Sequence, residues 1–386
     1  MSMGLDRRSF LGATALLAVP RLVFAQARTE RRFIFIIQRG AADGLNTVIP
    51  YAEPAYASLR GGLAIAPENA LKLDGTFALH PSLVNMREMY AAGHATFFHA
   101  VASPYRERSH FDGQNVLETG GSAPYQLKDG WLNRLLGAMP PAGKAAMAFS
   151  PSVPVAMRGA VEVSSYAPSA LPKANEDLLL RVAQLYADDA RLHALWSSAL
   201  EARGMAGGMS AGEGNRQDPA VLGRMAAGFL ARPDGPRIAM IETNGWDTHS
   251  GQHARLAAQL KGLDGMLAGL RDGLGAVWAE TVVLVATEFG RTVAANGTGG
   301  TDHGTGAVAM MAGGAVQGGR IVADWPGLAS GNLLEGRDLR PTLTLDSLIV
   351  AACAESFNLD PGKLAGVLFP HSPRGKPLQR LLRMKL

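Results

Sequence analysis

The feature that most restricts the fold of this chain is a series of continuous apolar runs, each about as long as a β-strand. They lie at residues 33–37, 95–102, 237–243, 281–287 and 307–313. Runs without polar alternation are typical of parallel strands that are buried on both faces. Between the third and the fourth run, apolar residues recur every three or four positions, as in a helix that packs on a sheet. The sequence therefore predicts an α/β fold with a mainly parallel central sheet and helices on both faces.

The length of 386 residues is enough for one large α/β domain or for two smaller ones. Residues 120–235 differ from the rest, because they include a long amphipathic pattern over 176–203 and then a glycine-rich segment. We therefore predict a single domain over residues 28–386, in which residues 120–235 form a helical elaboration on the sheet.

The N-terminal segment, residues 1–27, has the form of an export signal. Arg7 and Arg8 precede a short apolar stretch that ends in a small-residue A-x-A site at 25–27. Paired arginines are typical of the twin-arginine (Tat) pathway, and the stretch is shorter than the about 20 apolar residues that span a bilayer. The alternative is an amphipathic first helix of the fold. We expect a periplasmic or secreted mature chain without a membrane span, which contacts the Tat translocase during export.

Side chains that bind metals or transfer protons follow four of the apolar runs. In chain order they are Asp43, Arg106, Arg108, Ser109, His110, Asp112, Asp247, His249, His253, Glu288, Arg291, Asp302 and His303. Open α/β sheets bind ligands at the carboxyl ends of their strands, so these residues are expected to meet at one edge. A mixed set of aspartate, glutamate and histidine suits Zn²⁺, Mn²⁺ or Fe better than Mg²⁺ or Ca²⁺. The pattern predicts a divalent metal site.

Several of these residues also have an ordinary structural interpretation. Asp43 precedes a glycine, which is a common turn pair, and Asp247 is a candidate N-cap of the helix that follows it. His253 lies within that helix and suits its surface. Glu288 and Arg291 are close enough in sequence to form a simple ion pair. What favours a site is that the residues occur together, each time after a predicted strand.

Other function classes find no support. The net charge is +4, without a basic tract or interleaved aromatic residues, which argues against nucleic-acid binding. Phosphate-binding glycine loops of nucleotide enzymes are absent from the sequence. A G-x-S-x-G match at 208–212 lacks the preceding strand that a nucleophile elbow needs. Cys353 is the only cysteine, so no internal disulfide can form.

The motifs resemble a known family. The export signal, "RGAADGLN", "RSHFDGQNVLETG", "GWDTHSGQ", "TEFGRT" and "GTDHG" are together similar to the bacterial family catalogued as domain of unknown function 1501. The resemblance covers most of the chain after the signal. That family in turn resembles the alkaline phosphatase superfamily, which includes sulfatases and metal-dependent sugar-phosphate mutases. The resemblance implies an alkaline-phosphatase-like version of the predicted α/β fold.

The resemblance also implies roles for individual residues. Asp43, Asp247, His249, Glu288 and His303 correspond to metal ligands of one or two sites, and Ser109 corresponds to the nucleophile. Two departures from the superfamily pattern stand out: Phe289 follows Glu288 where a histidine is usual, and only one residue separates Asp247 from His249. His110, His253 and Asp302 are therefore alternative ligands, and the number of metal ions, one or two, stays open.

The expected activity is the metal-dependent hydrolysis of phosphate or sulfate esters, with a small molecule or a polymer as substrate. Ser109 or a metal-activated hydroxide would attack, and Arg108 or Arg291 would bind the oxygens of the transferred group. Two alternatives belong to other classes. One is an inactive homologue that binds an anionic glycan or a cell-surface polymer, and the other is a metal-stabilised assembly protein of an exported complex.

Overall fold

The computed structural model describes residues 30–140, 146–167, 176–186, 188–197, 218–372, 375 and 378–383. The predicted export signal and most of the glycine-rich segment after residue 203 lie outside the described residues. No helix in the described ranges is both long and apolar enough to cross a membrane.

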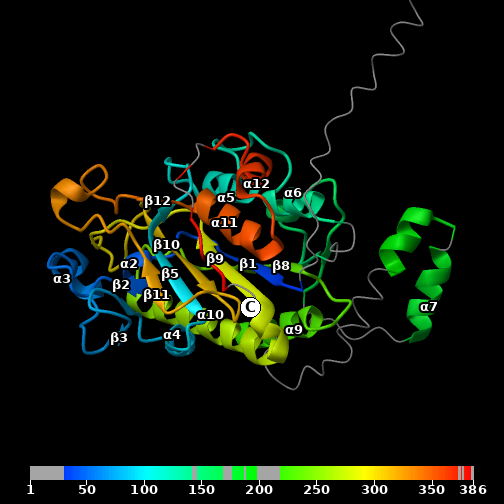
Figure 1. Ribbon diagram of the computed structural model, residues 1–386, viewed down its shortest axis with the longest axis horizontal. Coiled ribbons are helices and arrows are strands. Elements are labelled where there is room, and N and C mark those ends of the chain that lie inside the picture. The colour runs from blue at the N-terminus through cyan, green and yellow to red at the C-terminus, as the bar shows by residue number, and fades with distance from the viewer. Residues whose placement is uncertain are drawn as a thin grey trace, which may run out of the picture.

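A large sheet forms the centre of the molecule (Figure 1). Its strand order is β11-β5-β10-β9-β1-β8-β6-β7, and β12 pairs with β5. The strands are β1 (Arg32–Gln38), β5 (Ala95–Ala102), β6 (Ala146–Phe149), β7 (Ser164–Ser165), β8 (Ile238–Thr243), β9 (Thr281–Thr287), β10 (Ala307–Ala312), β11 (Arg320–Val322) and β12 (Leu343–Thr344). Only β10 runs antiparallel to its neighbours, β5 and β9. The prediction of a mainly parallel α/β sheet is confirmed.

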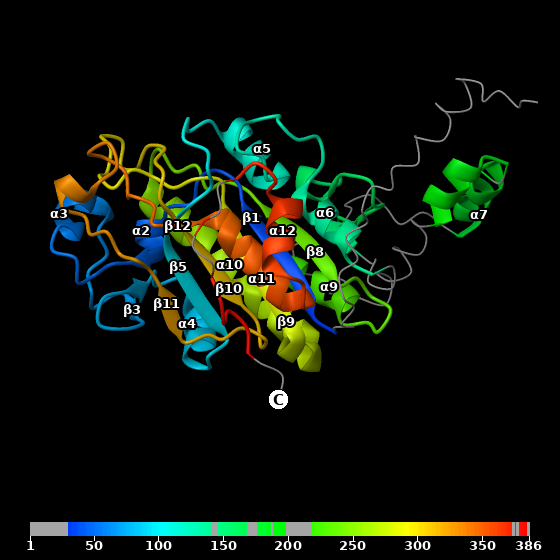
Figure 2. The same cartoon turned by 45° about the horizontal axis from the view of Figure 1, so that its top comes forward.

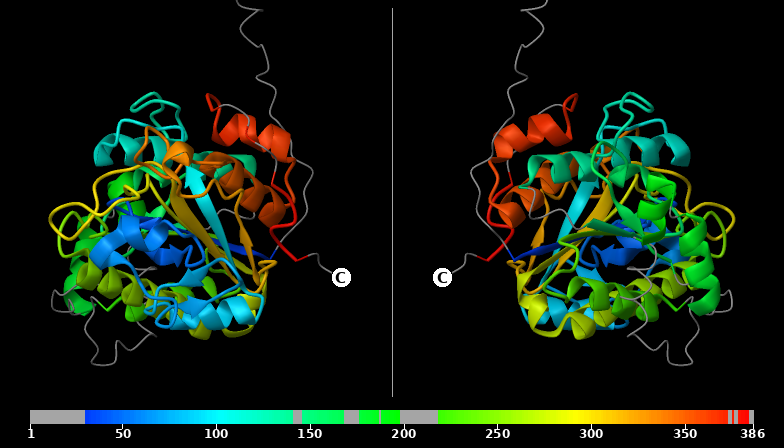
Figure 3. Two further views of the ribbon diagram at one scale, coloured as in Figure 1. Left: turned by 90° about the vertical axis from the view of Figure 1, so that its left-hand side faces the viewer. Right: turned by 90° about the vertical axis from the view of Figure 1, so that its right-hand side faces the viewer.

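Helices cover both faces of this sheet, as Figures 2 and 3 show. In β1, Phe33, Phe35 and Ile37 face a core formed with α5 (His110–Thr119), α6 (Trp131–Ala138), α11 (Leu345–Phe357) and α12 (Pro361–Leu368). Ile34 and Ile36 face the opposite core, with α4 (Val84–Ala91), α9 (Pro219–Leu230) and α10 (Gln252–Leu274). The alternation arises because successive strand residues point to opposite faces. Continuous apolar runs are therefore needed to fill both layers.

Smaller elements lie beside the main sheet. The helices α2 (Gly44–Thr47) and α3 (Tyr56–Arg60) follow β1 along the chain. A separate sheet consists of β2 (Val48–Ile49), β4 (Ala78–Leu79) and β3 (Leu71–Lys72). Short 3₁₀ helices span Gly61–Leu63, Val155–Met157, Gly275–Glu280 and Ser330–Asn332.

The segment over residues 120–235 differs from the predicted helical elaboration. It supplies β6 and β7 to the main sheet, and α9 packs along α10. The expected single helix over 176–203 is also wrong: α7 (Glu176–Leu185) ends before a turn, and a second helical segment spans 190–197. In Figure 1, α7 lies apart from the layers of the sheet. Short strands such as β6 and β7 have too few residues to be recognised by their pattern.

Candidate metal centre

The candidate site lies where several strands end. β1, β8 and β9 are mutually parallel, and β5 has the same direction because β10 is antiparallel to both β9 and β5. The loops after β5, β8 and β9 therefore meet at one edge of the sheet, the usual ligand edge of an open α/β fold. They supply His110 from the start of α5, Asp247 and His249 from the loop after β8, and His303 from the loop after β9.

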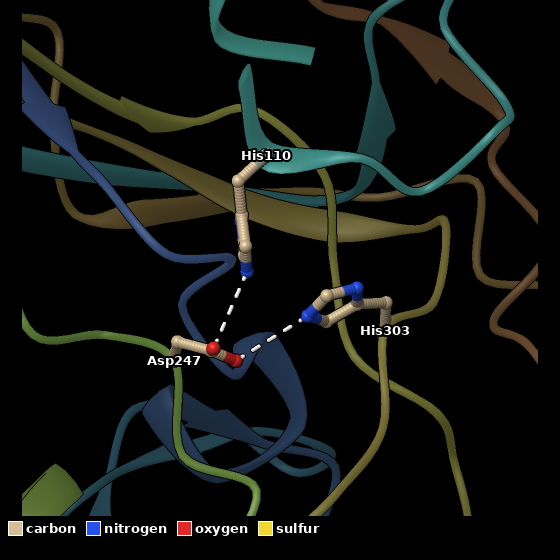
Figure 4. A group of neighbouring side chains, drawn as sticks. All are labelled: His110, Asp247 and His303. Carbon is tan, nitrogen blue, oxygen red and sulfur yellow. Dashed lines mark hydrogen bonds and ion pairs between the residues drawn. The ribbon is translucent and has the colours of Figure 1, made fainter. Parts of the chain in front are cut away.

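Three side chains converge closely enough to hold one metal ion (Figure 4). Each of His110, Asp247 and His303 offers one ligand atom, and these atoms all lie within 4.8 Å of one another. The two carboxylate oxygens of Asp247 lie 3.5 Å from His110 Nε2 and 3.3 Å from His303 Nε2. A tetrahedral ion with bonds of about 2.0–2.1 Å separates its ligand atoms by roughly 3.3 Å. The spacing thus fits a shared cation.

His249 lies beside this group. Its Nε2 atom is 2.9 Å from His303 Nε2 and 3.1 Å from Asp247 Oδ1. The side chain is 43 % exposed, so it forms the open side of the centre. His249 thus adds a third imidazole next to two members of the group, Asp247 and His303.

The other ring nitrogen of each histidine is held by an oxygen acceptor. His110 Nδ1 lies 2.8 Å from Glu288 Oε1, and His249 Nδ1 lies 3.2 Å from Asp302 Oδ1. His303 Nδ1 lies 2.8 Å from the backbone carbonyl of Arg108. A carboxylate or a carbonyl can only accept, so each Nδ1 carries the proton and each neutral ring presents a lone pair at Nε2. This is the usual arrangement behind metal-binding histidines.

The unprotonated Nε2 atoms of His249 and His303 then face only other acceptors, each other and Asp247 Oδ1. His110 Nε2 is buried and has no hydrogen-bond partner in the part of the chain that the structure describes. The facing lone pairs of His249 and His303 repel each other at 2.9 Å unless a proton or a metal cation lies between them. The donor set therefore fits a divalent cation on chemical grounds.

Glu288 supports His110 and does not belong to the converging group. Its side chain is fully buried and accepts hydrogen bonds from Gly40 N at 2.9 Å, Gln114 Nε2 at 3.0 Å and Thr287 Oγ1 at 2.9 Å, besides the contact with His110. Burial alone would raise the pKa of Glu288, but these donors outweigh it and hold the pKa below its ordinary value. A charged Glu288 fixes the ring of His110 and so positions its Nε2 atom.

The pKa values of His110 and His303 are shifted in opposite directions. The hydrogen bond to Glu288 raises the pKa of His110 above its ordinary value. Burial lowers the pKa of His303, and the nearby His110 lowers it further. His303 is therefore biased toward the neutral form that binds a metal.

The two arginines expected to bind substrate oxygens are both engaged by the protein. Arg291 is buried and donates from Nη1 to Asp247 Oδ1 at 2.7 Å, so it holds the carboxylate in place. Arg108 donates from Nη2 to Asp338 at 2.9 Å and to Glu335 at 2.6 Å. Its φ of 61° is in the left-handed region, which ordinary residues adopt rarely, and its carbonyl group holds His303. Both arginines thus position ligands in this structure.

Ser109 occupies the N-cap position of α5, directly before His110. Its backbone N–H donates to Tyr105 Oη at 3.1 Å. The Ser109 hydroxyl makes no hydrogen bond among the described residues, and it does not cap the helix. A hydroxyl group at this position is free to meet a ligand at the N-terminus of α5.

Two other predicted ligands lie elsewhere. Asp43 is the N-cap of α2, and its oxygens accept from the backbone N–H groups of Leu45 and Asn46 and from the side chains of Arg60 and Gln252. These donors use its acceptor sites, so in this structure Asp43 caps a short helix rather than forming the turn that its glycine neighbour suggested. His253 is exposed on α10, as its helical position suggested. Asp302 acts on the site through His249.

Phe289 forms an apolar wall of the centre. Its ring stacks on His110 with centroids 5.1 Å apart and lies 5.3 Å from the ring of His303. Gln114 was not among the predicted site residues. It joins Glu288 to Arg39, because it donates to Glu288 and accepts from Arg39 Nη1 at 2.8 Å. The signal was present, because His110 and Gln114 are four residues apart and so share a face of α5.

Comparisons with known proteins agree with the expected family. The family model described as "Protein of unknown function (DUF1501)" matches residues 30–364. No curated protein is similar enough to this chain to count as a relative.

The chain is also similar to several solved structures at low sequence identity. A putative sulfatase from Bacteroides thetaiotaomicron is 10 % identical, with a TM-score of 0.39 over 90 % of this chain and 76 % of that chain. The C-terminal periplasmic domain of EptC from Escherichia coli, in complex with Zn, is 9 % identical, with a TM-score of 0.38 over 75 % of each chain. Alkaline phosphatase from the Antarctic bacterium TAB5 is 10 % identical, with a TM-score of 0.34 over 74 % of this chain and 92 % of that chain.

Proposed function

We propose that this chain, which belongs to the DUF1501 family, is a metal-dependent hydrolase of phosphate or sulfate esters. Its own residues argue for the metal, and the resemblance of its motifs to the alkaline phosphatase superfamily implies the class of substrate. One observation carries the proposal. The histidines His110, His249 and His303 each direct an Nε2 lone pair toward the carboxylate of Asp247, and each has its Nδ1 atom held by an acceptor. Such a set is built for a cation and is costly without one.

The proposed ligands are His110, Asp247, His249 and His303, and the ion is Zn²⁺, Mn²⁺ or Fe. Three imidazoles and one carboxylate suit borderline divalent ions and favour Zn²⁺ among them. We propose one ion rather than two. Asp43 is occupied by other donors, and Phe289 lies where a further histidine would be expected. Among the described residues, only one group of ligand-type side chains converges in this way.

When bound, a divalent cation would stabilise negative charge on the ester oxygens as a Lewis acid. The chain's own residues would do the rest. Glu288 and Arg291 keep His110 and Asp247 in position. The Ser109 hydroxyl, which is free of other hydrogen bonds, is the proposed nucleophile. The N-terminus of α5 presents backbone N–H groups and a positive dipole end, which favour an anionic ester there.

The first test is the metal content of the mature chain from residue 28 onward, measured by elemental mass spectrometry. We expect one stoichiometric divalent metal in the wild type and little in His303→Ala or Asp247→Ala. His253→Ala is the matched control, because this histidine is exposed on α10, and it should keep the metal. Aryl phosphate and aryl sulfate esters would then be screened for hydrolysis. A protein that purifies without metal and takes up neither Zn²⁺ nor Mn²⁺ would contradict the proposal.

We also propose that the protein is exported to the periplasm or beyond by the Tat pathway. The support is the paired Arg7 and Arg8 before an apolar stretch and an A-x-A site. Replacing both arginines by lysine should keep the chain in the cytoplasm, as measured by cell fractionation. Unchanged export of that variant would exclude the Tat route.

A further inference from the structure

Gln252 lies between the two loops that supply most of the proposed ligands. The loop after β8 carries Asp247 and His249, and the loop after β9 carries His303. Gln252 is the first residue of α10, and its side chain is fully buried, although glutamine is mostly exposed in proteins. A buried amide needs partners for its polar atoms, and these partners show what the side chain does.

The partners of Gln252 fix the orientation of its amide group. Its Nε2 atom donates to the carboxylate of Asp43, which can only accept. Its Oε1 atom accepts from two hydroxyl groups, Thr248 Oγ1 at 2.9 Å and Thr301 Oγ1 at 2.6 Å. Both threonines are fully buried, so water does not compete for these hydrogen bonds. One oxygen atom therefore joins the loop after β8 to the loop after β9.

Both threonines are close to proposed ligands in the chain. Thr248 stands between Asp247 and His249, and Thr301 precedes His303 by two residues. In Figure 4, Asp247 and His303 lie on separate segments of the chain. The spacing of 3.3 Å between Asp247 Oδ1 and His303 Nε2 therefore depends on how the two loops are held together, as does the spacing of 2.9 Å between the Nε2 atoms of His249 and His303.

The same hydrogen bonds reach Asp247 through Arg291. The hydroxyl proton of Thr301 is used on Gln252, so the oxygen accepts from Arg291 Nε at 3.1 Å. Arg291 in turn donates from Nη1 to Asp247 Oδ1 at 2.7 Å. A guanidinium group can only donate, so the direction of each of these bonds is fixed. Gln252 thus supports the carboxylate of Asp247 as well as the spacing of the loops.

The backbones of the two loops are packed closely at the same place. A Cβ atom at Gly300 would lie 2.3 Å from the backbone of Thr248 and His249, so this approach requires glycine. On the outer side, Asn296 Nδ2 donates to the carbonyl of His249 at 2.9 Å, at a partly exposed position. Gln252 adds a buried bridge on the inner side, where hydrogen bonds are stronger than in contact with water.

We infer that Gln252 is a positioning residue of the metal centre, which sets the spacing between the loops that carry Asp247, His249 and His303. The inference rests on the proposed metal site but does not depend on which reaction that site catalyses. An amide suits the position because it offers a donor to Asp43 and an acceptor to two hydroxyl groups at once. A carboxylate lacks the donor, and an apolar side chain lacks both.

The test compares Gln252→Met with the wild type, because methionine keeps the length of the side chain but replaces the amide. Competition with a chromogenic chelator measures the Zn²⁺ affinity, and the visible absorption of the Co²⁺-loaded protein reports the geometry of the ligands. We expect the affinity to fall about tenfold, at the lower end of the range for partners behind a ligand, and the Co²⁺ spectrum to change.

Asn133→Leu is the matched control. It replaces another buried amide, in α6 on the other face of the sheet, whose Nδ2 atom donates to the carbonyl groups of Met157 and Val161. This variant should lose stability but keep the Zn²⁺ affinity and the Co²⁺ spectrum of the wild type. The control therefore separates the loss of a buried amide from the loss of the bridge between the loops.

Amide hydrogen exchange of the metal-free protein gives a second readout, which needs no ligand. The backbone N–H of Thr301 donates to the carbonyl of Thr248 at 3.3 Å, and that of Gln252 donates to the carbonyl of Gly299 at 2.9 Å. Both bonds cross between the loops, so peptides that contain Thr301 or Gln252 should exchange faster in Gln252→Met. Their exchange in Asn133→Leu should stay as in the wild type.

The outcomes separate this inference from the proposed function. An unchanged Zn²⁺ affinity in Gln252→Met, or an equal loss in Asn133→Leu, would overturn the inference alone. Faster exchange in Gln252→Met without a loss of affinity would also overturn it, because Gln252 would then stabilise only the fold. A wild type that binds metal but hydrolyses no ester would overturn the proposed function alone. A wild type that binds no metal would overturn both.

Discussion

Asp43 and Asp247 follow neighbouring parallel strands, β1 and β8, and the sequence predicts both as metal ligands, yet the fold uses them in opposite ways. Asp43 is 1 % exposed and accepts from Arg60, Gln252 and two backbone N–H groups. The side chain of Asp247 is 41 % exposed, and apart from Arg291 its nearest polar neighbours are imidazole nitrogens.

The difference teaches what makes a carboxylate available to a metal. Position at a strand end brings both groups to the correct edge of the sheet, but the donors around each decide its role. Hydrogen-bond donors occupy the lone pairs of the Asp43 carboxylate, so this side chain stabilises the fold and has none left for a metal. The imidazole neighbours of Asp247 present unprotonated Nε2 atoms, which donate no hydrogen bonds to it. The carboxylate of Asp247 is therefore available to a cation. Metal content and stability can therefore be separated by mutation.

The largest effect is expected at Asp43. Asp43→Ala would leave the buried guanidinium of Arg60 without its counter-charge, which destabilises a protein by about 3–5 kcal/mol. Urea unfolding of the mature protein, followed by circular dichroism, measures this loss. Asp43→Ala/Arg60→Met removes both charges and should recover much of it. The folded fraction of either variant should keep its metal, and a loss of metal without a loss of stability would return Asp43 to the ligand set.

Asp247→Ala should give the opposite pattern. We expect metal affinity to fall by more than about 100-fold, because a direct ligand matters more than the partners behind it, whose loss costs about 10–100-fold. The unfolding free energy of the metal-free protein should fall by less than in Asp43→Ala, since Asp247 is partly exposed, but it should fall, because the buried guanidinium of Arg291 loses its carboxylate partner. Added Zn²⁺ should raise the melting temperature of the wild type but not that of the variant. Equal stabilisation of both by Zn²⁺ would place the metal elsewhere.

Glu288→Gln tests the support behind His110. The substitution keeps the size of the side chain but removes the charge that orients the imidazole, so metal affinity should fall by about 10–100-fold. Competition with a chromogenic chelator measures the affinity. Glu118→Gln is the matched control, because this buried carboxylate pairs with Arg39 and touches none of the proposed ligands. Similar affinities in the two variants would show that Glu288 has only a structural role.

The sequence predicted the sheet because its strands carry an unmistakable signal. In β1, β5 and β9 every residue is buried, and continuous apolar runs encode this directly. The antiparallel direction of β10 was not predictable, since its apolar run has the same form as that of a parallel strand. The two-residue strands β7 and β12 carry no pattern at all.

The site was predictable as a set of loops but not as a set of contacts. Asp247, His249 and His303 were predicted as ligands, and the structure brings their ligand atoms together. Glu288 was predicted as a ligand and His110 only as an alternative. The sequence alone could not decide which of the two side chains faces the ion. Which of them faces the ion depends on the packing of α5 against Phe289 and on the donors of Gly40 and Gln114. Those partners are distant in the chain and come together only in the fold.

The smallest predicted effect concerns a third carboxylate, Asp346 in the first turn of α11, which has neither the donors of Asp43 nor the imidazoles of Asp247. Burial raises the pKa of Asp346 to about 6. The folded state therefore holds this proton more tightly than the unfolded chain, where the pKa is about 3.9. Its contribution to stability is fully present below about pH 4 and is lost as the pH rises through about 6.

Asp346→Asn should abolish this pH dependence, because the amide does not ionise. Above pH 6 the variant should be more stable than the wild type by about 1–2 kcal/mol, which allows for the partial exposure of the side chain. Urea unfolding at a series of pH values from 4 to 8 measures the difference between the two proteins. A difference in unfolding free energy that stays constant from pH 4 to 8 would contradict this prediction. It would mean that the charge of Arg106 offsets the cost of burial and keeps Asp346 ionised in the fold.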